Sequence, residues 1–159
     1  MAGSTVKKVV VRRFDRESLP GFVNPQSYLR PEGVELLRPD GTVSVIPYQD
    51  VKSVAFVRDF EDGEQEPERK IFTARPKMGG LWVRMRLRDG DQMDGVLSNN
   101  LLQLDFYGFT VTPPDPDSGS QRVFVPRAAL RDLQVLGVVG SPLRRAKPKG
   151  SKDQIRLFE

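Results

Sequence analysis

Hydrophobic and polar residues alternate along several short segments of the chain. Apolar side chains occupy every second position at Val9 and Val11, and again at Val83, Met85 and Leu87. Each run leads into a polar turn sequence, DRES after the first and RDGD after the second. A period of two residues is typical of a β-strand that buries one face. The pattern therefore predicts a mostly β protein built from short strands.

This alternating pattern occurs twice. Two pairs of segments align, at offsets of 74 and 79 residues: 9–23 with 83–97, and 45–57 with 124–136. The alignment places Gly21 on Gly95 and Pro47 on Pro126. A repeat of this length indicates a duplicated unit whose copies share one fold. In both copies we expect the alternating residues to face the core: Val9, Val11, Leu19, Val83, Met85 and Met93.

Each copy contains the elements of a small five-stranded barrel. GVELL and TVSVI flank Asp40 and Gly41, a dipeptide that favours a tight hairpin turn. A short helical turn that begins at a proline precedes the last strand of each copy. Closing such a sheet removes its exposed edges. We therefore predict two repeated barrels, over 1–57 and 81–140, joined by a linker or extended hairpin over 58–80 whose KIFTA segment pairs with a barrel edge.

The second copy resembles two families of small barrels. VRMRLRDGDQMDGVL is similar to the first Sm motif, in which alternating apolar positions lead through an Asp-Gly turn to a glycine and an apolar residue. VFVPRAALRDLQVL is similar to the closing strands of bacterial Hfq, and SH3-like barrels share much of this pattern. The resemblance implies tandem Sm-like or SH3-like barrels of an uncharacterised bacterial family with no assigned activity. It does not imply RNA chemistry, because the second Sm motif and the RNA-binding residues of those families have no match here.

The chain contains no histidine and no cysteine. It therefore lacks the usual general base near neutral pH, the thiolate nucleophile and the common zinc ligands. We predict a protein that is not an enzyme and that uses neither a cofactor nor a metal. The sequence has no run of eighteen apolar residues and no apolar N-terminal signal, so we expect no membrane contact and a cytoplasmic location.

The acidic segment DGDQMDG (89–95) invites comparison with a calcium-binding loop. Such a loop needs oxygen ligands at its first, third and fifth positions and a glycine at its sixth. Met93 and Asp94 occupy the fifth and sixth positions here. We therefore expect a turn with solvated carboxylates rather than a metal site.

Three arginines alternate along the strand that precedes this segment: Arg84, Arg86 and Arg88. Alternate residues of a strand share one face, so these side chains form either a track for phosphates or a solvated outer face. The acids that follow weaken the positive field, which favours the solvated face. Trp82 is the only tryptophan. We expect it to cover a barrel end or the contact between the copies, with stacking on a nucleic-acid base as the alternative.

The net charge of the chain lies in its C-terminal segment. Residues 141–159 contain six basic and two acidic residues, which account for the whole net charge of +4. Pro148 and Gly150 add to a composition that suits a disordered basic tail rather than a core. We predict non-specific contact with DNA or RNA phosphates through five of these cations: Arg144, Arg145, Lys147, Lys149 and Lys152.

The tail ends with three large apolar residues in the sequence QIRLF. This sequence resembles the peptide with which many bacterial proteins bind the DNA polymerase sliding clamp, and it matches at Gln154, Ile155, Leu157 and Phe158. The resemblance implies that Leu157 and Phe158 fill an apolar pocket as anchors. Ile155 would lie in a flanking groove, and Gln154 would satisfy backbone groups at the pocket rim.

The sequence thus predicts a non-enzymatic adaptor that tethers tandem β-barrels to DNA replication or repair through the sliding clamp. The alternative is an Sm-like protein that binds RNA or single-stranded nucleic acid and uses the tail for electrostatic affinity. Two other fates of the QIRLF residues stay open: they fold back on a barrel as a terminal strand, or they bind another partner. The ligand of the barrels and the oligomeric state are not predicted.

Overall fold

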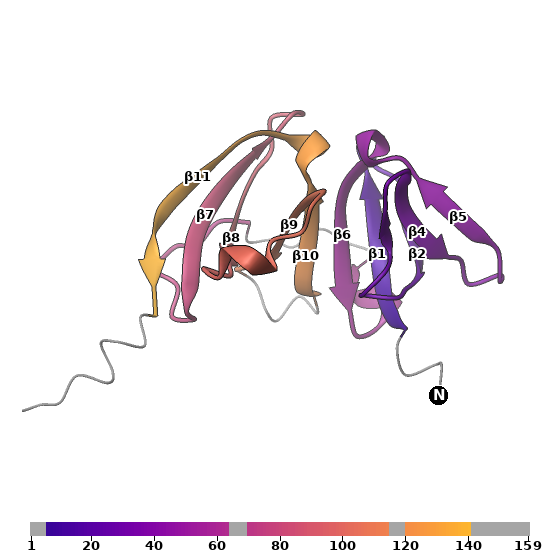
Figure 1. The fold of residues 1–159 in the computed structure, drawn as a ribbon, viewed down its shortest axis with the longest axis horizontal. Helices are drawn as coiled ribbons and strands as arrows, with labels where there is room; N and C mark the ends of the chain where they lie inside the picture. The colour runs from indigo at the N-terminus through magenta and orange to yellow at the C-terminus, as the bar shows by residue number, and fades with distance from the viewer. Residues whose placement is uncertain (1–5, 64–69, 115–119, 141–159) are drawn as a thin grey trace, which may run out of the picture.

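The computed structural model describes residues 6–63, 70–114 and 120–140, which form one curled antiparallel sheet shaped as a half-barrel (Figure 1). The mostly β class predicted from the alternation is confirmed. The strands are β1 (Lys7–Arg13), β2 (Ser18–Val23), β3 (Leu29–Arg30), β4 (Gly33–Leu37), β5 (Val43–Ile46), β6 (Val51–Val57), β7 (Gly80–Leu87), β8 (Gln92–Leu97), β9 (Gly108–Thr112), β10 (Ser120–Pro126) and β11 (Leu130–Val139). Short 3-10 turns lie between them: η2 (Tyr48–Asp50), η3 (Phe60–Gly63), η4 (Leu101–Gln103) and η6 (Arg127–Ala129).

The strands pair in the order β11-β7-β8-β9-β10-β6-β1-β2-β4-β3, and β5 pairs with β4. We call β1 to β6 the N-terminal half and β7 to β11 the C-terminal half. The sequence predicts two separate barrels, whereas the described strands form one sheet. The reason is that β10 of the C-terminal half pairs with β6 of the N-terminal half.

The first hairpin of each half contains a glycine at the same place. Gly21 lies in β2 and Gly95 in β8, the two positions that the sequence alignment equates. A Cβ atom at Gly21 would come within 2.6 Å of the Leu36 side chain, and one at Gly95 within 2.5 Å of the Val111 side chain. Only a residue without a side chain allows the neighbouring strand to pack this closely.

The last strand of each half carries the same β-bulge. β6 pairs with β1, and Lys52 is an extra residue opposite the step from Arg12 to Arg13. β11 pairs with β7, and Arg131 is an extra residue opposite the step from Arg86 to Leu87. A bulge re-aims the side chain that it contains. Lys52 and Arg131 therefore hold equivalent positions 79 residues apart.

Two hydrophobic cores lie on opposite faces of the central strands. In β1, Val9 and Val11 belong to one core, whereas Val10 belongs to the other. A strand that is buried on both faces reads as a continuous apolar run, which explains the sequence Val9-Val10-Val11. The predicted core positions are confirmed: Val9, Val11, Val83 and Met85 are fully buried, and Leu19 and Met93 are partly buried against the two cores.

The segment that joins the halves includes η3 and then runs beside β8. The Lys70 carbonyl accepts a hydrogen bond of 2.7 Å from the backbone N–H of Asp94. β9 pairs with β8 only at Val96 and Leu97, and the first residue of the KIFTA segment, Lys70, bonds to β8 at Asp94, outside these two pairs. Among the residues described, no helix has the length and apolar character needed to span a membrane.

Candidate interaction surface

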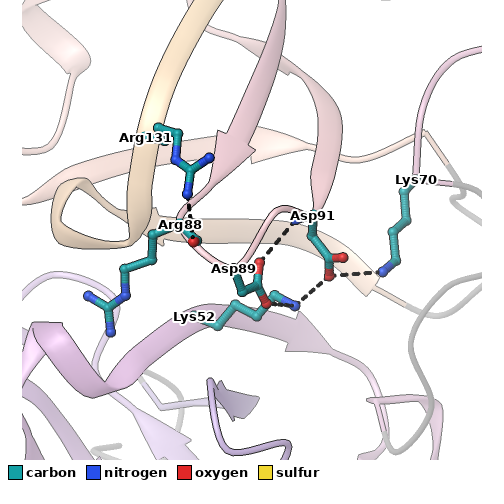
Figure 2. Close-up of polar contacts among 6 residues, drawn as sticks. All are labelled: Lys52, Lys70, Arg88, Asp89, Asp91 and Arg131. Atoms are coloured by element: carbon teal, nitrogen blue, oxygen red, sulfur yellow. Dashed lines mark hydrogen bonds and ion pairs between the residues drawn. The ribbon is translucent and has the colours of Figure 1, made fainter.

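A charged cluster joins the two halves at the β7–β8 turn (Figure 2). We call it the charged junction, and it consists of Lys52, Lys70, Arg88, Asp89, Asp91 and Arg131. The bulge in β6 directs Lys52 at the turn, where its Nζ lies 2.9 Å from Asp89 Oδ2 and 2.5 Å from Asp91 Oδ2. Lys70 Nζ lies 3.4 Å from the same oxygen of Asp91. The Asp91 N–H donates to Asp89 Oδ1 at 3.1 Å, which fixes the shape of the turn.

These contacts keep the junction charged. The hydrogen bond from Lys52 is the largest influence on Asp91 and lowers the pKa of its carboxyl. Burial, the largest influence on Asp89, acts to raise its pKa, but the hydrogen bonds from Lys52 and from the Asp91 backbone outweigh it and leave the pKa lowered. Burial likewise acts against the charged form of Lys52, and its two carboxylate partners outweigh this and raise its pKa. All three groups are therefore ionised at neutral pH and form ion pairs between the two halves.

Two arginines pin the same turn to the backbone of both halves. The Arg88 guanidinium donates to the carbonyl of Ala128 at 3.2 Å and to the carbonyl of Gln49, and it lies 4.1 Å over the Phe14 ring. Arg131 Nη2 donates to the Arg88 carbonyl at 3.1 Å. The turn is therefore held by residues from both halves of the sheet.

A polar hollow of about 600 Å³ opens beside the charged junction. It is lined by Arg12, Arg13, Phe14, Arg16, Glu17, Ser18, Lys52, Lys70, Asp89 and Asp91. Arg16, in the turn between β1 and β2, has a φ of 75°, a conformation that few residues other than glycine adopt. The five cations exceed the three acids, but Lys52 and Lys70 are already paired with Asp89 and Asp91. The hollow is thus a nearly balanced polar site, with only a small excess of positive charge.

The third acid of the turn segment, Asp94, lies elsewhere. Its side chain is fully buried and accepts hydrogen bonds from Arg84 Nε at 2.7 Å, from Trp82 Nε1 at 3.1 Å and from the backbone N–H of Phe72 at 3.0 Å. Burial acts to raise the pKa of Asp94, and these donors outweigh it and lower the pKa. The prediction of solvated carboxylates is therefore wrong for Asp94.

The three alternating arginines do not act as one track. Arg84 is paired with Asp94 and Arg88 with backbone carbonyls, so two of the three guanidinium groups are already engaged in contacts within the protein. Trp82 packs edge-on against Phe72, with 6.2 Å between the ring centroids, and donates its N–H to Asp94. Its ring thus belongs to the structure around Asp94. Among the described residues, no group of three or more carboxylates is placed to hold a metal ion.

The sequence analysis missed an aromatic surface at the meeting point of η2, η6 and the β8–β9 loop. We call it the aromatic groove; it has a volume of about 710 Å³ and is lined by Tyr48, Leu104, Asp105, Phe106, Tyr107, Arg127 and Ala128. Tyr48 and Tyr107 stack with 4.9 Å between their ring centroids and an angle of 16° between their planes. Phe106 packs edge-on against Tyr107 at 4.8 Å, yet it is 81% exposed.

Backbone contacts hold the aromatic groove in shape. The Tyr48 hydroxyl donates to the Arg30 carbonyl at 2.5 Å, and the Arg127 N–H donates to the Tyr107 carbonyl at 2.8 Å. Burial is the main cause that raises the pKa of Tyr48 to about 12, so its hydroxyl remains a donor. Leu101 and Leu102 extend the apolar surface along the same loop, with 67% and 95% exposure. The sequence did contain an indication of this groove, because LLQLDFYGF (101–109) is rich in large apolar residues that do not alternate regularly with polar ones.

The predicted tail residues lie outside the described part of the chain. These are the clamp-binding candidates Gln154, Ile155, Leu157 and Phe158, and the cations Arg144, Arg145, Lys147, Lys149 and Lys152. The residues described at the charged junction and the aromatic groove come from the strands, turns and loops of the two halves.

Comparisons with known proteins connect the sheet to one family. No curated protein and no solved structure matches the chain. The matching family model covers both halves of the sheet and most of β11. The chain belongs to DUF6982, a family of unknown function whose model matches residues 5–137.

Proposed function

We propose that the protein is a non-enzymatic adaptor that binds the bacterial DNA sliding clamp through its QIRLF peptide. The observation that carries the proposal is the match of that sequence at all four constrained positions: Gln154, Ile155, Leu157 and Phe158. Two adjacent apolar anchors suit a hydrophobic pocket. A peptide that becomes ordered on binding gives up part of its interaction energy, so micromolar affinity is expected.

The basic residues before the peptide add a second contact. Because the clamp encircles DNA, a bound tail holds Arg144, Arg145 and Lys147 near duplex phosphates. Such contacts depend on salt and carry no sequence specificity. The proposal therefore includes a non-specific DNA contact that acts only when the peptide is bound.

In this proposal the sheet consists of two duplicated Sm-like or SH3-like units, over 1–57 and 81–140. Support comes from the equivalent glycines, Gly21 and Gly95, and from the equivalent bulges at Lys52 and Arg131. The segment 58–80 links the units. The carboxylates of the charged junction are ion-paired, and the aromatic groove offers apolar contact area. Both features suit a binding module.

The test is a titration of a labelled peptide of residues 150–159 with a purified bacterial sliding clamp. We expect saturable binding, loss of binding when Leu157 and Phe158 are both changed to Ala, and little effect of Arg156→Ala, which alters the variable position. No saturation up to about 100 µM, or equal binding of the double variant, would remove the clamp from the proposal.

A second candidate function is binding of single-stranded nucleic acid. The observation in its favour is the exposed Phe106 ring beside the stacked Tyr48 and Tyr107, with Arg127 in the same groove. Exposed aromatic rings beside a cation are the usual platform for stacked bases. This candidate predicts that full-length protein binds a labelled oligonucleotide, and that Phe106→Ala weakens binding while Leu157→Ala with Phe158→Ala does not. The opposite pattern favours the clamp.

A further inference from the structure

Three described strands have an edge without a strand partner: the two-residue β3, and the longer β5 and β11. β5 pairs with β4 alone, and β11 pairs with β7 alone. Figure 1 shows the two strands at opposite ends of the longest axis of the molecule, β11 at the left and β5 at the right. An uncovered strand edge is a template for another strand. Because of their positions, β5 and β11 of one molecule cannot pair with each other.

Two strand edges equivalent to those of β5 and β11 pair with each other inside the molecule, in the contact between β10 and β6. β6 is the last strand of the N-terminal half, and β10 is the strand that leads through a proline and a 3-10 turn into the last strand of the C-terminal half. Their counterparts in the other half are β11 and β5. Pro47 follows β5 as Pro126 ends β10, with nearly equal backbone angles at the two prolines. The unpaired edges are therefore the equivalents of the edges that join the halves.

Side chains at equivalent positions differ in exposure between the internal β6–β10 contact and the unpaired edges of β5 and β11. At the junction between the halves, Phe56 of β6 is 5% exposed and Phe124 of β10 is 0% exposed. Their counterparts at the free edges are also apolar, but Val135 of β11 is 56% exposed and Val45 of β5 is 46% exposed. Exposed apolar side chains that line up along an edge mark an interaction surface. β5 and β11 thus expose apolar side chains at positions whose equivalents are buried in the internal β6–β10 contact.

The internal register gives the register of the external contact. Arg122 pairs with Phe56 in the β10–β6 junction. Moving each residue to its counterpart 79 positions away places Val43 of β5 opposite Val135 of β11. The neighbouring internal pairs follow in the same way and place two further residues of β5 opposite β11: Ser44 opposite Gln134, and Val45 opposite Leu133.

We propose that a second copy of this chain covers these edges, with β5 of one molecule pairing antiparallel with β11 of the next. The contact is head-to-tail, so it forms a ring if the rotation closes and a filament if it does not. Arg75 Nη2 donates to the Val138 carbonyl at 2.5 Å and lies beyond the predicted register, so it leaves the pairing positions clear. The inference is independent of the tail and of the proposed clamp binding.

Cysteine crosslinking tests the register directly, because the natural chain contains no cysteine. Full-length Val43→Cys and Val135→Cys proteins are mixed and treated with a short thiol crosslinker. We expect a heterodimeric product from this mixture. The matched control is Val43→Cys with Val138→Cys, since Val138 is 54% exposed on the same strand but lies outside the predicted register. Equal products from both mixtures, or none from either, would overturn the proposed pairing.

Sedimentation velocity of the full-length protein supplies the second readout. We expect the average mass to rise with concentration and to return to that of a monomer in Val45→Lys and in Val135→Lys, because a lysine on an edge strand opposes pairing. Leu102→Lys, which places the same charge on an exposed loop, should leave the association unchanged. Circular dichroism and melting confirm that each variant is folded. A natural protein that stays monomeric up to about 100 µM, a concentration that corresponds to weak association, contradicts the proposal.

Discussion

Lys52 and Arg131, the extra residues of two equivalent β-bulges, reach the same turn from opposite halves of the sheet. Lys52 makes ion pairs with Asp89 and Asp91 of the β7–β8 turn, whereas Arg131 donates one hydrogen bond to the carbonyl of Arg88 in that turn. One bulge position therefore has two different uses. In the C-terminal half it contacts the turn of its own half, and in the N-terminal half it holds the two halves together.

This difference predicts unequal effects of removing the two charges. Lys52→Met should lower the free energy of unfolding by about 1–2 kcal/mol, because it leaves two partly exposed carboxylates without their main donor. Arg131→Met removes the same charge at the equivalent bulge but only one exposed hydrogen bond, and should cost at most about 0.5 kcal/mol. Urea unfolding at neutral pH measures both values. Equal losses would contradict the role assigned to the charged junction.

The lowered pKa values of Asp89, Asp91 and Asp94 predict a loss of stability in acid. A carboxyl whose folded-state pKa lies below its unfolded value contributes stability that is present above the unfolded pKa and is lost as the pH falls through the folded pKa. Unfolding free energy should therefore be level above about pH 5 and fall below about pH 4. The raised pKa of Lys52 has the opposite sign, since its stabilisation is complete below the unfolded pKa and is lost at strongly alkaline pH. Thermal melting measured from acid to strongly alkaline pH tests both expectations. A melting temperature that does not fall below about pH 4 would contradict the ion-pair assignment.

Asp94 is expected to be the most sensitive of the three acids. Asp94→Ala leaves Arg84 without its carboxylate and the Trp82 N–H without its acceptor, and should cost about 2–4 kcal/mol. Trp82 is the only tryptophan, so its fluorescence reports directly on the site and should change in the folded variant. Arg86→Ala is the control, because Arg86 is exposed and lies on β7, the strand that carries Trp82 and Arg84. A small loss in Asp94→Ala without a fluorescence change would show that the network is not important for stability.

The features predicted from the sequence are those that neighbouring residues encode. Strand alternation, the turns and the equivalence of Gly21 with Gly95 all follow from local spacing and from positions where a side chain does not fit. The alignment of residues 45–57 with 124–136 also gives the equivalence of Lys52 with Arg131. The period of a strand depends only on the backbone, so these features can be read without knowing the neighbours of each strand.

The remaining features depend on contacts between distant segments. The β10–β6 pairing could not be predicted, because alternation does not say which edge meets which. The partner of Asp91 lies 39 residues away, at Lys52, so the DGDQMDG segment alone suggests solvated acids. The aromatic groove brings Tyr48 to Tyr107 across the two halves, a contact between residues far apart in the sequence that local spacing does not indicate.

The two-sided burial of β1 leads to the last prediction. In a strand with one buried face, a charge at Val11 would be disruptive and a charge at Val10 would be tolerated. Here Val10 and Val11 are both buried, in different cores, with 1% and 0% exposure. Val10→Asp and Val11→Asp should therefore both abolish folding, because the cost of burying an unpaired carboxylate exceeds the stability of a marginal domain.

Val43→Asp is the matched control, since Val43 has the same side chain but is 60% exposed on β5. It should retain the circular dichroism spectrum and nearly the same melting temperature when measured at low protein concentration, where association through β5 contributes little. Folded Val10→Asp protein beside unfolded Val11→Asp protein would mean that β1 has only one buried face. That result would also remove the second core from β1 and with it the reason why the sequence Val9-Val10-Val11 interrupts the alternation.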